Sequence, residues 1–116
     1  MMKTDVDRLI EALLQYLNFS FDVRISFNGD RSTDDIYSVS IHVYDYKYYW
    51  TTVEGNALIL ELVHEKDGDE YYRTITIEGD VINIGDKKIR LPNVTVQVGH
   101  SYDDGLTIRI RNRDKK

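Results

Sequence analysis

The chain has 116 residues, of which 41% are hydrophobic and 30% charged, and its formal net charge is −5. This length is typical of one globular domain with its own core, so we expect residues 1–116 to form a single domain. The chain has no cysteine, which excludes disulfides and thiolate metal ligands. No apolar run is as long as a membrane span and no signal peptide is evident, so we expect a cytoplasmic protein.

Charge is unevenly distributed along the chain. Residues 1–105 contain 10 Lys and Arg against 19 Asp and Glu, whereas residues 106–116 contain 5 against 1. An acidic body repels a phosphate backbone, which disfavours general nucleic-acid binding. The same acidity complements a basic protein partner, although it also serves solubility alone.

The first predicted element is an amphipathic helix over residues 4–17. Thr4 and Asp7 resemble a capping box at its start. We expect its apolar stripe to pack against the protein's own sheet and not on a foreign protein. The stripe follows the helical repeat and consists of Val6, Leu9, Ile10, Leu13, Leu14 and Leu17.

The rest of the chain predicts β-strands joined by short connections. Residues 19–27 alternate between apolar and polar side chains, which is typical of a strand with one buried face. Further strands are predicted at about 36–50, 57–65, 70–78, 81–84, 87–91, 94–102 and 106–112.

Two dipeptides predict tight hairpins. The Asp-Gly pair at residues 67–68 is a favoured two-residue turn, and it would place Leu60 opposite Ile75 on an apolar face. The Gly-Asp pair at residues 85–86 suits a second such turn, which would place Ile82 opposite Ile89.

The last hairpin is predicted around a three-residue loop at residues 103–105. Gly105 suits the left-handed position of such a loop. This connection would place Val98 opposite Ile110 and Tyr102 opposite Leu106.

These elements predict an α+β fold that is mostly β. The N-terminal helix would pack on an antiparallel meander of about eight strands, because the connections are too short for parallel crossovers. A flat sheet of that size would expose too much apolar surface. We therefore expect a curled sheet, a partly open barrel or a two-layer sandwich, with the helix plugging an open side.

Catalytic and metal-binding signatures are missing from the sequence. His42, His64 and His100 lack metal-ligand spacing, and neither a nucleophile motif nor a glycine-rich phosphate loop occurs. Paired aspartates at residues 34–35 and 103–104 fall in predicted loops, where Asp is a common turn residue. We therefore expect a protein that is not an enzyme and that uses no metal or cofactor.

The tyrosine-rich second half of strand 36–50 is the main candidate for a binding site. From Tyr37 to Val43 the apolar residues lie on one face of this predicted strand, and from Tyr44 onward most of them lie on the other. The aromatic rings therefore form a stripe on the second face. Exposed aromatic rings favour protein interfaces. A bulge near residues 44–45 would instead carry the rings into the core, and stacking on bases or sugars is a third alternative. The candidate partner-binding residues are His42, Tyr44, Tyr46, Tyr48 and Trp50.

A second candidate surface is basic and consists of Arg109, Arg111 and Arg113 near the end of the chain. Such residues either contact phosphate or protect a sheet edge against aggregation.

We therefore expect a small acidic interaction protein that binds a protein partner or associates with itself. A sharper form of this hypothesis is an inhibitor or immunity-type protein that occupies a basic, nucleic-acid-handling surface of its target. One alternative is a small-ligand-binding β-barrel with the helix as a lid. The other is a single-stranded nucleic-acid binder that combines the tyrosine strand with Arg109 and Arg111.

Overall fold

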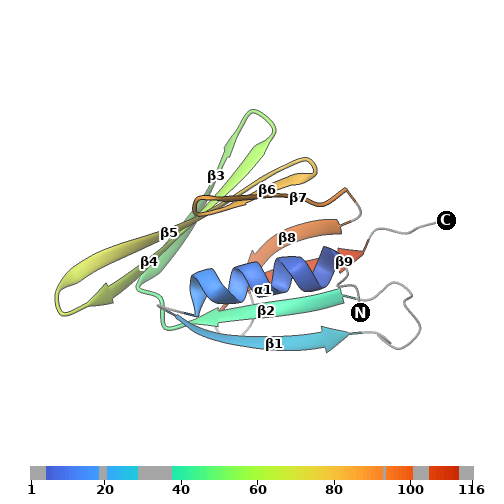
Figure 1. Ribbon diagram of the computed structural model, residues 1–116. Helices are drawn as coiled ribbons and strands as arrows, with labels where there is room; N and C mark the ends of the chain where they lie inside the picture. The colour runs from blue at the N-terminus through green and yellow to red at the C-terminus, as the bar shows by residue number, and fades with distance from the viewer. Residues whose placement is uncertain (1–4, 19–20, 29–37, 93, 101–104, 113–116) are drawn as a thin grey trace.

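The computed structural model describes residues 5–18, 21–28, 38–92, 94–100 and 105–112. Within these ranges the chain forms one helix and nine strands (Figure 1). Their bounds are α1 Asp5–Leu17, β1 Asp22–Asn28, β2 Ser38–Tyr44, β3 Tyr48–Glu54, β4 Ala57–Lys66, β5 Asp69–Glu78, β6 Val81–Ile84, β7 Lys87–Arg90, β8 Val94–His100 and β9 Leu106–Asn112.

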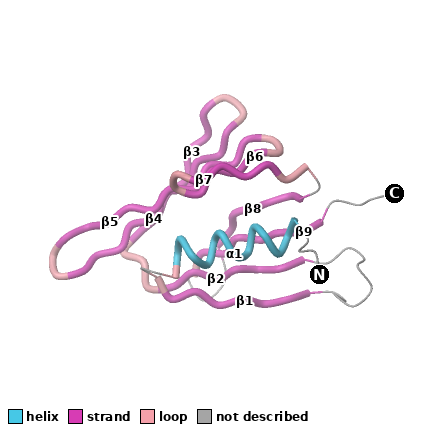
Figure 2. Tube along the Cα trace, viewed as in Figure 1, coloured by secondary structure: helices cyan, strands magenta, loops and turns pink. Residues whose placement is uncertain are grey.

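The strands form two antiparallel sheets, and with the one helix they confirm the predicted α+β, mostly β fold. The first sheet has the order β1-β2-β9-β8 and the second has the order β3-β4-β5-β6-β7. The second sheet is a meander whose consecutive strands are joined by short turns (Figure 2). In the first sheet β2 pairs with β9, so strands far apart in the sequence lie side by side. The described strands therefore form two separate sheets and no closed barrel.

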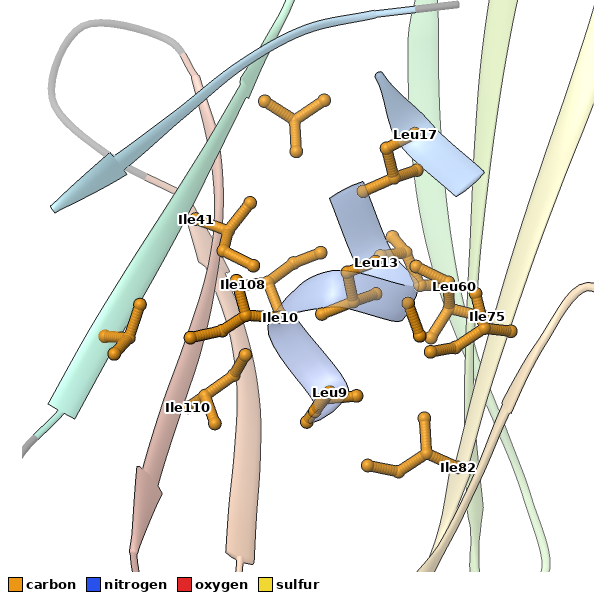
Figure 3. Close-up of a cluster of buried hydrophobic side chains, with 14 of the residues drawn as sticks. Leu9, Ile10, Leu13, Leu17, Ile41, Leu60, Ile75, Ile82, Ile108 and Ile110 are labelled. Atoms are coloured by element: carbon orange, nitrogen blue, oxygen red, sulfur yellow. The ribbon is translucent and has the colours of Figure 1, made fainter. Parts of the chain in front are cut away.

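Helix α1 lies between the two sheets and supplies the middle of the core. Figure 3 shows Leu9, Ile10 and Leu13 between Ile41 of the first sheet and Leu60 of the second. The predicted apolar stripe therefore packs against the protein's own sheets. In the described part of the chain, no helix has the length and apolarity needed to cross a membrane.

The strand predicted over residues 36–50 is wrong as one element, because it forms two strands in different sheets. β2 ends at Tyr44, and Asp45 follows in a left-handed conformation with φ 67°. Asp tolerates this conformation better than most residues, and it directs the chain out of the first sheet. β3 then continues to Glu54, beyond the predicted end. The change in apolar parity marks this crossing between sheets and not a bulge within one strand.

The predicted register is confirmed in two hairpins of the second sheet. Leu60 lies opposite Ile75, and Ile82 lies opposite Ile89.

In the last hairpin the predicted register is wrong by two residues. Val98 lies opposite Ile108, whereas the prediction placed it opposite Ile110. A shift of two residues keeps every side chain on its face, so the alternation cannot distinguish the two registers. The loop residues 103–104 and Tyr102 lie outside the described residues.

Tyr16 connects the helix to the second sheet. Its hydroxyl accepts a hydrogen bond of 2.9 Å from the backbone N–H of Thr74, just beyond the paired part of β5 and β6. The Arg73 guanidinium lies over the Tyr16 ring, 5.3 Å from its centroid. Gly85 sits against the same ring, where an added Cβ would lie 2.7 Å from Cε1 of Tyr16. The Tyr16 ring thus fits against the second sheet because Gly85 has no side chain at this position.

Candidate functional site

The candidate partner-binding residues do not form one continuous stripe, contrary to the prediction. His42 and Tyr44 belong to β2 in the first sheet, whereas Tyr48 and Trp50 belong to β3 in the second. Tyr46 lies between the two strands, is half-buried, and packs against the core. The separation follows from the crossing at Asp45, so these residues belong to two different surfaces.

Tyr48 and Trp50 form the centre of an exposed aromatic surface on the second sheet. Their rings stack with centroids 5.6 Å apart and an interplanar angle of 21°, and they are 40% and 39% exposed. Tyr72 of β5 lies on the same side of the sheet, because both Tyr48 and Tyr72 pair with Val63 of β4. We call Tyr48, Trp50, Val63 and Tyr72 the aromatic face.

Val63 shows that the aromatic face has a packed base. Its side chain points away from the helix because Leu62, its neighbour, belongs to the main core. Val63 is nevertheless fully buried, with Tyr48 and Tyr72 directly opposite it on the two flanking strands. The two tyrosine rings therefore shield an apolar residue on one side and remain open to a partner on the other.

A carboxylate holds the tyrosines of the aromatic face in place. Glu70 accepts hydrogen bonds from the hydroxyls of Tyr72 at 3.1 Å and of Tyr48 at 3.4 Å. It also accepts a bond of 2.8 Å from Nζ of Lys47, which in turn lies 3.4 Å from Glu65. These contacts tie five side chains from β4, β5 and the start of β3 into one network.

The network changes the acidity of its members. Hydrogen bonds from Lys47 and then Tyr72 lower the pKa of Glu70 below its ordinary value, and the same bond to Glu70 raises the pKa of Lys47. The hydrogen bond to Glu70, followed by that with Tyr48, raises the pKa of Tyr72 from 10.0 to about 12. At neutral pH Glu70 is therefore a carboxylate, Lys47 an ammonium group and Tyr72 a neutral phenol.

The surroundings of the aromatic face are acidic. Glu61 lies opposite Trp50 and accepts a hydrogen bond of 3.3 Å from the hydroxyl of Thr74. Glu61 and Glu65 alternate with Val63 along β4, so all three side chains point to the same side of the sheet. Together with Glu70 they place three carboxylates beside the rings, and Lys47 forms ion pairs with Glu65 and Glu70.

The basic residues lie on the other sheet. Arg109 and Arg111 belong to β9 and alternate with the buried Ile108 and Ile110, so they point away from the helix. Arg113 lies outside the described residues. The structure therefore does not bring the basic residues next to the aromatic face, as joint binding of a single-stranded nucleic acid would require.

A pocket of about 650 Å³ lies next to Arg109, and the sequence analysis missed it. Most of its polar lining comes from alternate residues of three strands in the first sheet. The pocket forms only because β2 pairs with β9, and this pairing joins residues that are far apart in the sequence. No local sequence pattern therefore indicates the pocket. His42, predicted to belong with the tyrosines, is part of this pocket. The polar lining residues are Ser40, His42, Gln97, Gly99, His100, Thr107 and Arg109.

His42 and His100 both line this pocket, whereas His64 lies elsewhere. The Tyr49 hydroxyl lies 2.8 Å from Nδ1 of His100, whereas His64 packs its ring edge-on against Phe21 with centroids 5.6 Å apart. Nδ1 of His64 is buried without a hydrogen-bond partner in the described structure. Within the described ranges, no three His, Asp or Glu side chains are grouped so that they could hold a metal ion.

The chain matches no protein-family model, and comparisons with curated proteins and with solved structures find no match either.

Proposed function

We propose that this chain is a small, non-enzymatic interaction protein whose aromatic face binds a basic surface of a protein partner. The observation that supports this most is the grouping of exposed rings on one side of the second sheet. Tyr48, Trp50 and Tyr72 are each about two-fifths to one-half exposed there. Tyr and Trp at the centre of a patch are the side chains that contribute most to binding energy in protein interfaces.

The side chains of the aromatic face are held in fixed positions by their neighbours, and this also favours binding. Tyr48 stacks on Trp50 and, like Tyr72, donates a hydrogen bond to Glu70. Side chains that are already held in one conformation lose less entropy when a partner covers them. The network around Glu70 therefore prepares a contact surface in the unbound protein.

Charge indicates the kind of partner. Glu61, Glu65 and Glu70 border the rings, and the chain as a whole has a net charge of −5. Complementary charge orients a partner and speeds its association. The partner should therefore present Lys or Arg side chains around an apolar centre. A nucleic-acid-handling protein blocked by this chain is the sharper form of the proposal, and its support is this charge alone.

The two alternative functions have less support from the geometry. The helix carries core residues such as Leu9 and Leu13 between the sheets, so it is not placed as a lid over a ligand. The aromatic and basic residues needed by a nucleic-acid binder lie on different sheets.

Two neighbouring tyrosines provide a matched test of the proposal. Tyr72 is 48% exposed on the aromatic face, and Tyr71 is 46% exposed on the opposite side of the same strand. A partner is first captured from the source organism with the wild-type protein, and its affinity is then measured with purified variants. We expect Tyr72→Ala and Trp50→Ala each to weaken binding by about 2 kcal/mol or more. Tyr71→Ala should leave the affinity nearly unchanged.

Salt provides the second arm of the same experiment. We expect the affinity to fall as ionic strength rises from about 0.05 M to about 0.5 M, because the bordering carboxylates are exposed to screening. The proposal fails if folded Trp50→Ala and Tyr72→Ala proteins bind the partner as tightly as wild type. If sedimentation instead shows a second copy as the occupant, both variants should shift the protein towards monomer.

A further inference from the structure

The pocket in the first sheet is built from two rows of directly paired residues. Ser40, Arg109 and Gln97 form one row across β2, β9 and β8. His42, Thr107 and Gly99 form the next row. All six positions alternate with core residues along their strands, so they lie on the side turned away from the helix.

Small residues leave the space that the pocket occupies. Ser40 is 4% exposed, Thr107 is buried, and Gly99 has no side chain. A Cβ added to Gly99 would meet no described atom within 4 Å. Larger side chains from Arg109, His42 and Gln97 also line the space. The pocket is thus a hollow over the sheet surface with polar groups around it.

Much of the hydrogen-bonding capacity of this lining is unused. The side chains of Ser40, Gln97 and Arg109 form no hydrogen bond or ion pair with any residue that the structure describes. His42 and Thr107 have only each other there, with Nδ1 and Oγ1 3.4 Å apart. Polar groups in concave sites need a partner from solvent or from a ligand.

The charge of the lining favours an anion. Arg109 is a full cation, and none of the described residues around the pocket is an Asp or Glu. Such a site is unusual in a chain with 20 acidic residues against 15 basic ones. A guanidinium group matches a carboxylate or phosphate with two parallel hydrogen bonds, and hydroxyl, amide and imidazole groups can complete its coordination.

The size and the apolar part of the lining favour an organic ligand over a simple ion. The volume of about 650 Å³ lies within the roughly 300–1,000 Å³ usual for small-molecule sites. Leu58, Val96 and Val98 also line the pocket and are half-buried; Val96 and Val98 lie on the helix-facing side of β8, so they line it around the edge of this outermost strand. These residues offer a surface for a hydrocarbon or ring portion of a ligand.

We infer that this pocket binds a small organic anion. Its carboxylate or phosphate group is held by Arg109 with His42 and Gln97, and its apolar part packs beside Val96 and Val98. This site is separate from the aromatic face, so it is a binding activity beyond the proposed function.

Phenyl phosphate and benzoate are suitable probes, with benzyl alcohol as the neutral control. Binding is followed by amide chemical shifts of the full chain in an NMR titration. We expect both anions, or one of them, to shift the signals of β8 and β9 around Gly99 and Thr107, and benzyl alcohol to shift them much less. Tighter binding of phenyl phosphate identifies a phosphate ligand, and tighter binding of benzoate a carboxylate ligand.

Two arginines of the same strand separate a built site from general charge attraction. Arg109 lines the pocket, whereas Arg111, two residues further along β9, does not. We expect Arg109→Gln to weaken anion binding by about tenfold or more, since it removes a charge-assisted bidentate contact. Arg111→Gln should change it by less than about twofold, as expected for a screened surface charge.

Gly99→Leu tests the space itself, because it fills the pocket without removing a polar group. The backbone φ of Gly99 is outside the left-handed region, and a Cβ added there would meet no described atom within 4 Å, so the variant should fold. We expect it to abolish probe binding while the circular dichroism spectrum stays unchanged. The inference is overturned if neither anion binds, if benzyl alcohol binds equally well, or if the two arginine variants have equal effects.

Discussion

The carboxylate of Glu70 accepts hydrogen bonds from two phenols and one ammonium group at the border of the aromatic face. The contacts from Lys47 and Tyr48 are distant in the sequence, since these two residues lie at the start of a different hairpin, whereas Tyr72 is two residues from Glu70 on the same strand. Because Glu70 holds Tyr48 and Tyr72 together, we expect it to influence both the shape and the acidity of the binding surface.

The phenol of Tyr72 should titrate near pH 12, because its proton is held in the hydrogen bond to Glu70. Since this pKa is raised from 10.0 on folding, the bond's contribution to stability is complete below pH 10 and is lost as the pH rises through about 12. The measurement is an NMR titration of the tyrosine Cζ carbons. We expect Glu70→Gln to move the midpoint of Tyr72 down towards 10.

Glu65→Gln is the control for this titration. Glu65 lies near Lys47 but accepts no hydrogen bond from Tyr72 among the described contacts, so the variant should leave the Tyr72 midpoint in place. A wild-type midpoint at the ordinary tyrosine value would contradict the network as described.

At the scale of elements, the helix and the second sheet meet at one specific contact. Tyr16 occupies the position next to Gly85 and supplies the acceptor for the N–H of Thr74. A buried N–H without a partner is costly, so this hydroxyl compensates for the place where β6 stops pairing with β5.

Two glycines in turns of the second sheet allow the Tyr16 contact to be measured. Gly55 and Gly85 have φ of 60° and 62°, but only Gly85 faces Tyr16, and a Cβ at Gly55 would meet nothing within 4 Å. We expect Gly55→Ala to lower the free energy of unfolding by about 1 kcal/mol, the cost of a left-handed alanine. Gly85→Ala should cost about 1–3 kcal/mol more, because it forces Tyr16 to move.

Urea denaturation of both variants measures this difference directly. Adding Tyr16→Ala should make the two glycine substitutions equal in cost, since the obstructing ring is gone. Equal costs with Tyr16 present would show that the ring does not press against this turn.

At the scale of the whole molecule, the helix joins two sheets that otherwise have separate hairpins. Leu13 is 1% exposed between them, whereas Leu14 on the next helix position is only partly buried. Because residues of both sheets contribute to one core cluster around the helix, we expect them to unfold in a single transition.

Leu13→Ala should therefore destabilise the whole protein by about 2–5 kcal/mol, the usual cost of a cavity at a fully buried leucine. Leu14→Ala should cost clearly less. Trp50 fluorescence reports on the second sheet, and amide signals of β2 and β9 report on the first. The two reporters should give the same urea midpoint in each variant, and separate midpoints would contradict a shared core.

The two sheets also present different charges to their surroundings. The outer side of the first sheet bears Arg109 and Arg111, whereas that of the second bears Glu61, Glu65 and Glu70. The proposed anion pocket and the proposed surface for a basic partner therefore lie on different sheets. Strand alternation places these charged groups on the sides of the two sheets that are turned away from the helix.

Local patterns were sufficient for the helix, for the two tight hairpins and for the inward-facing residues. The apolar stripe from Val6 to Leu17 and the Asp-Gly turn at residues 67–68 depend on neighbours in the chain, and both are found as predicted. Thr4 of the predicted capping box lies outside the described residues. The sequence also showed that the apolar residues change faces near Tyr44. It did not show that the chain passes there from one sheet to the other. Periodicity records which side of a strand is buried and does not record which sheet buries it.

The pairing of β2 with β9, the crossing at Asp45 and the final hairpin register depended on the folded chain. Tyr72 joined Tyr48 through Val63 of the strand between them, and His42 joined Arg109 through the pocket, across strands that are distant in the sequence. Such contacts form because buried area across the whole core outweighs the entropy of closing long loops. That balance is a property of all the strands together, so no single segment of the chain reveals it.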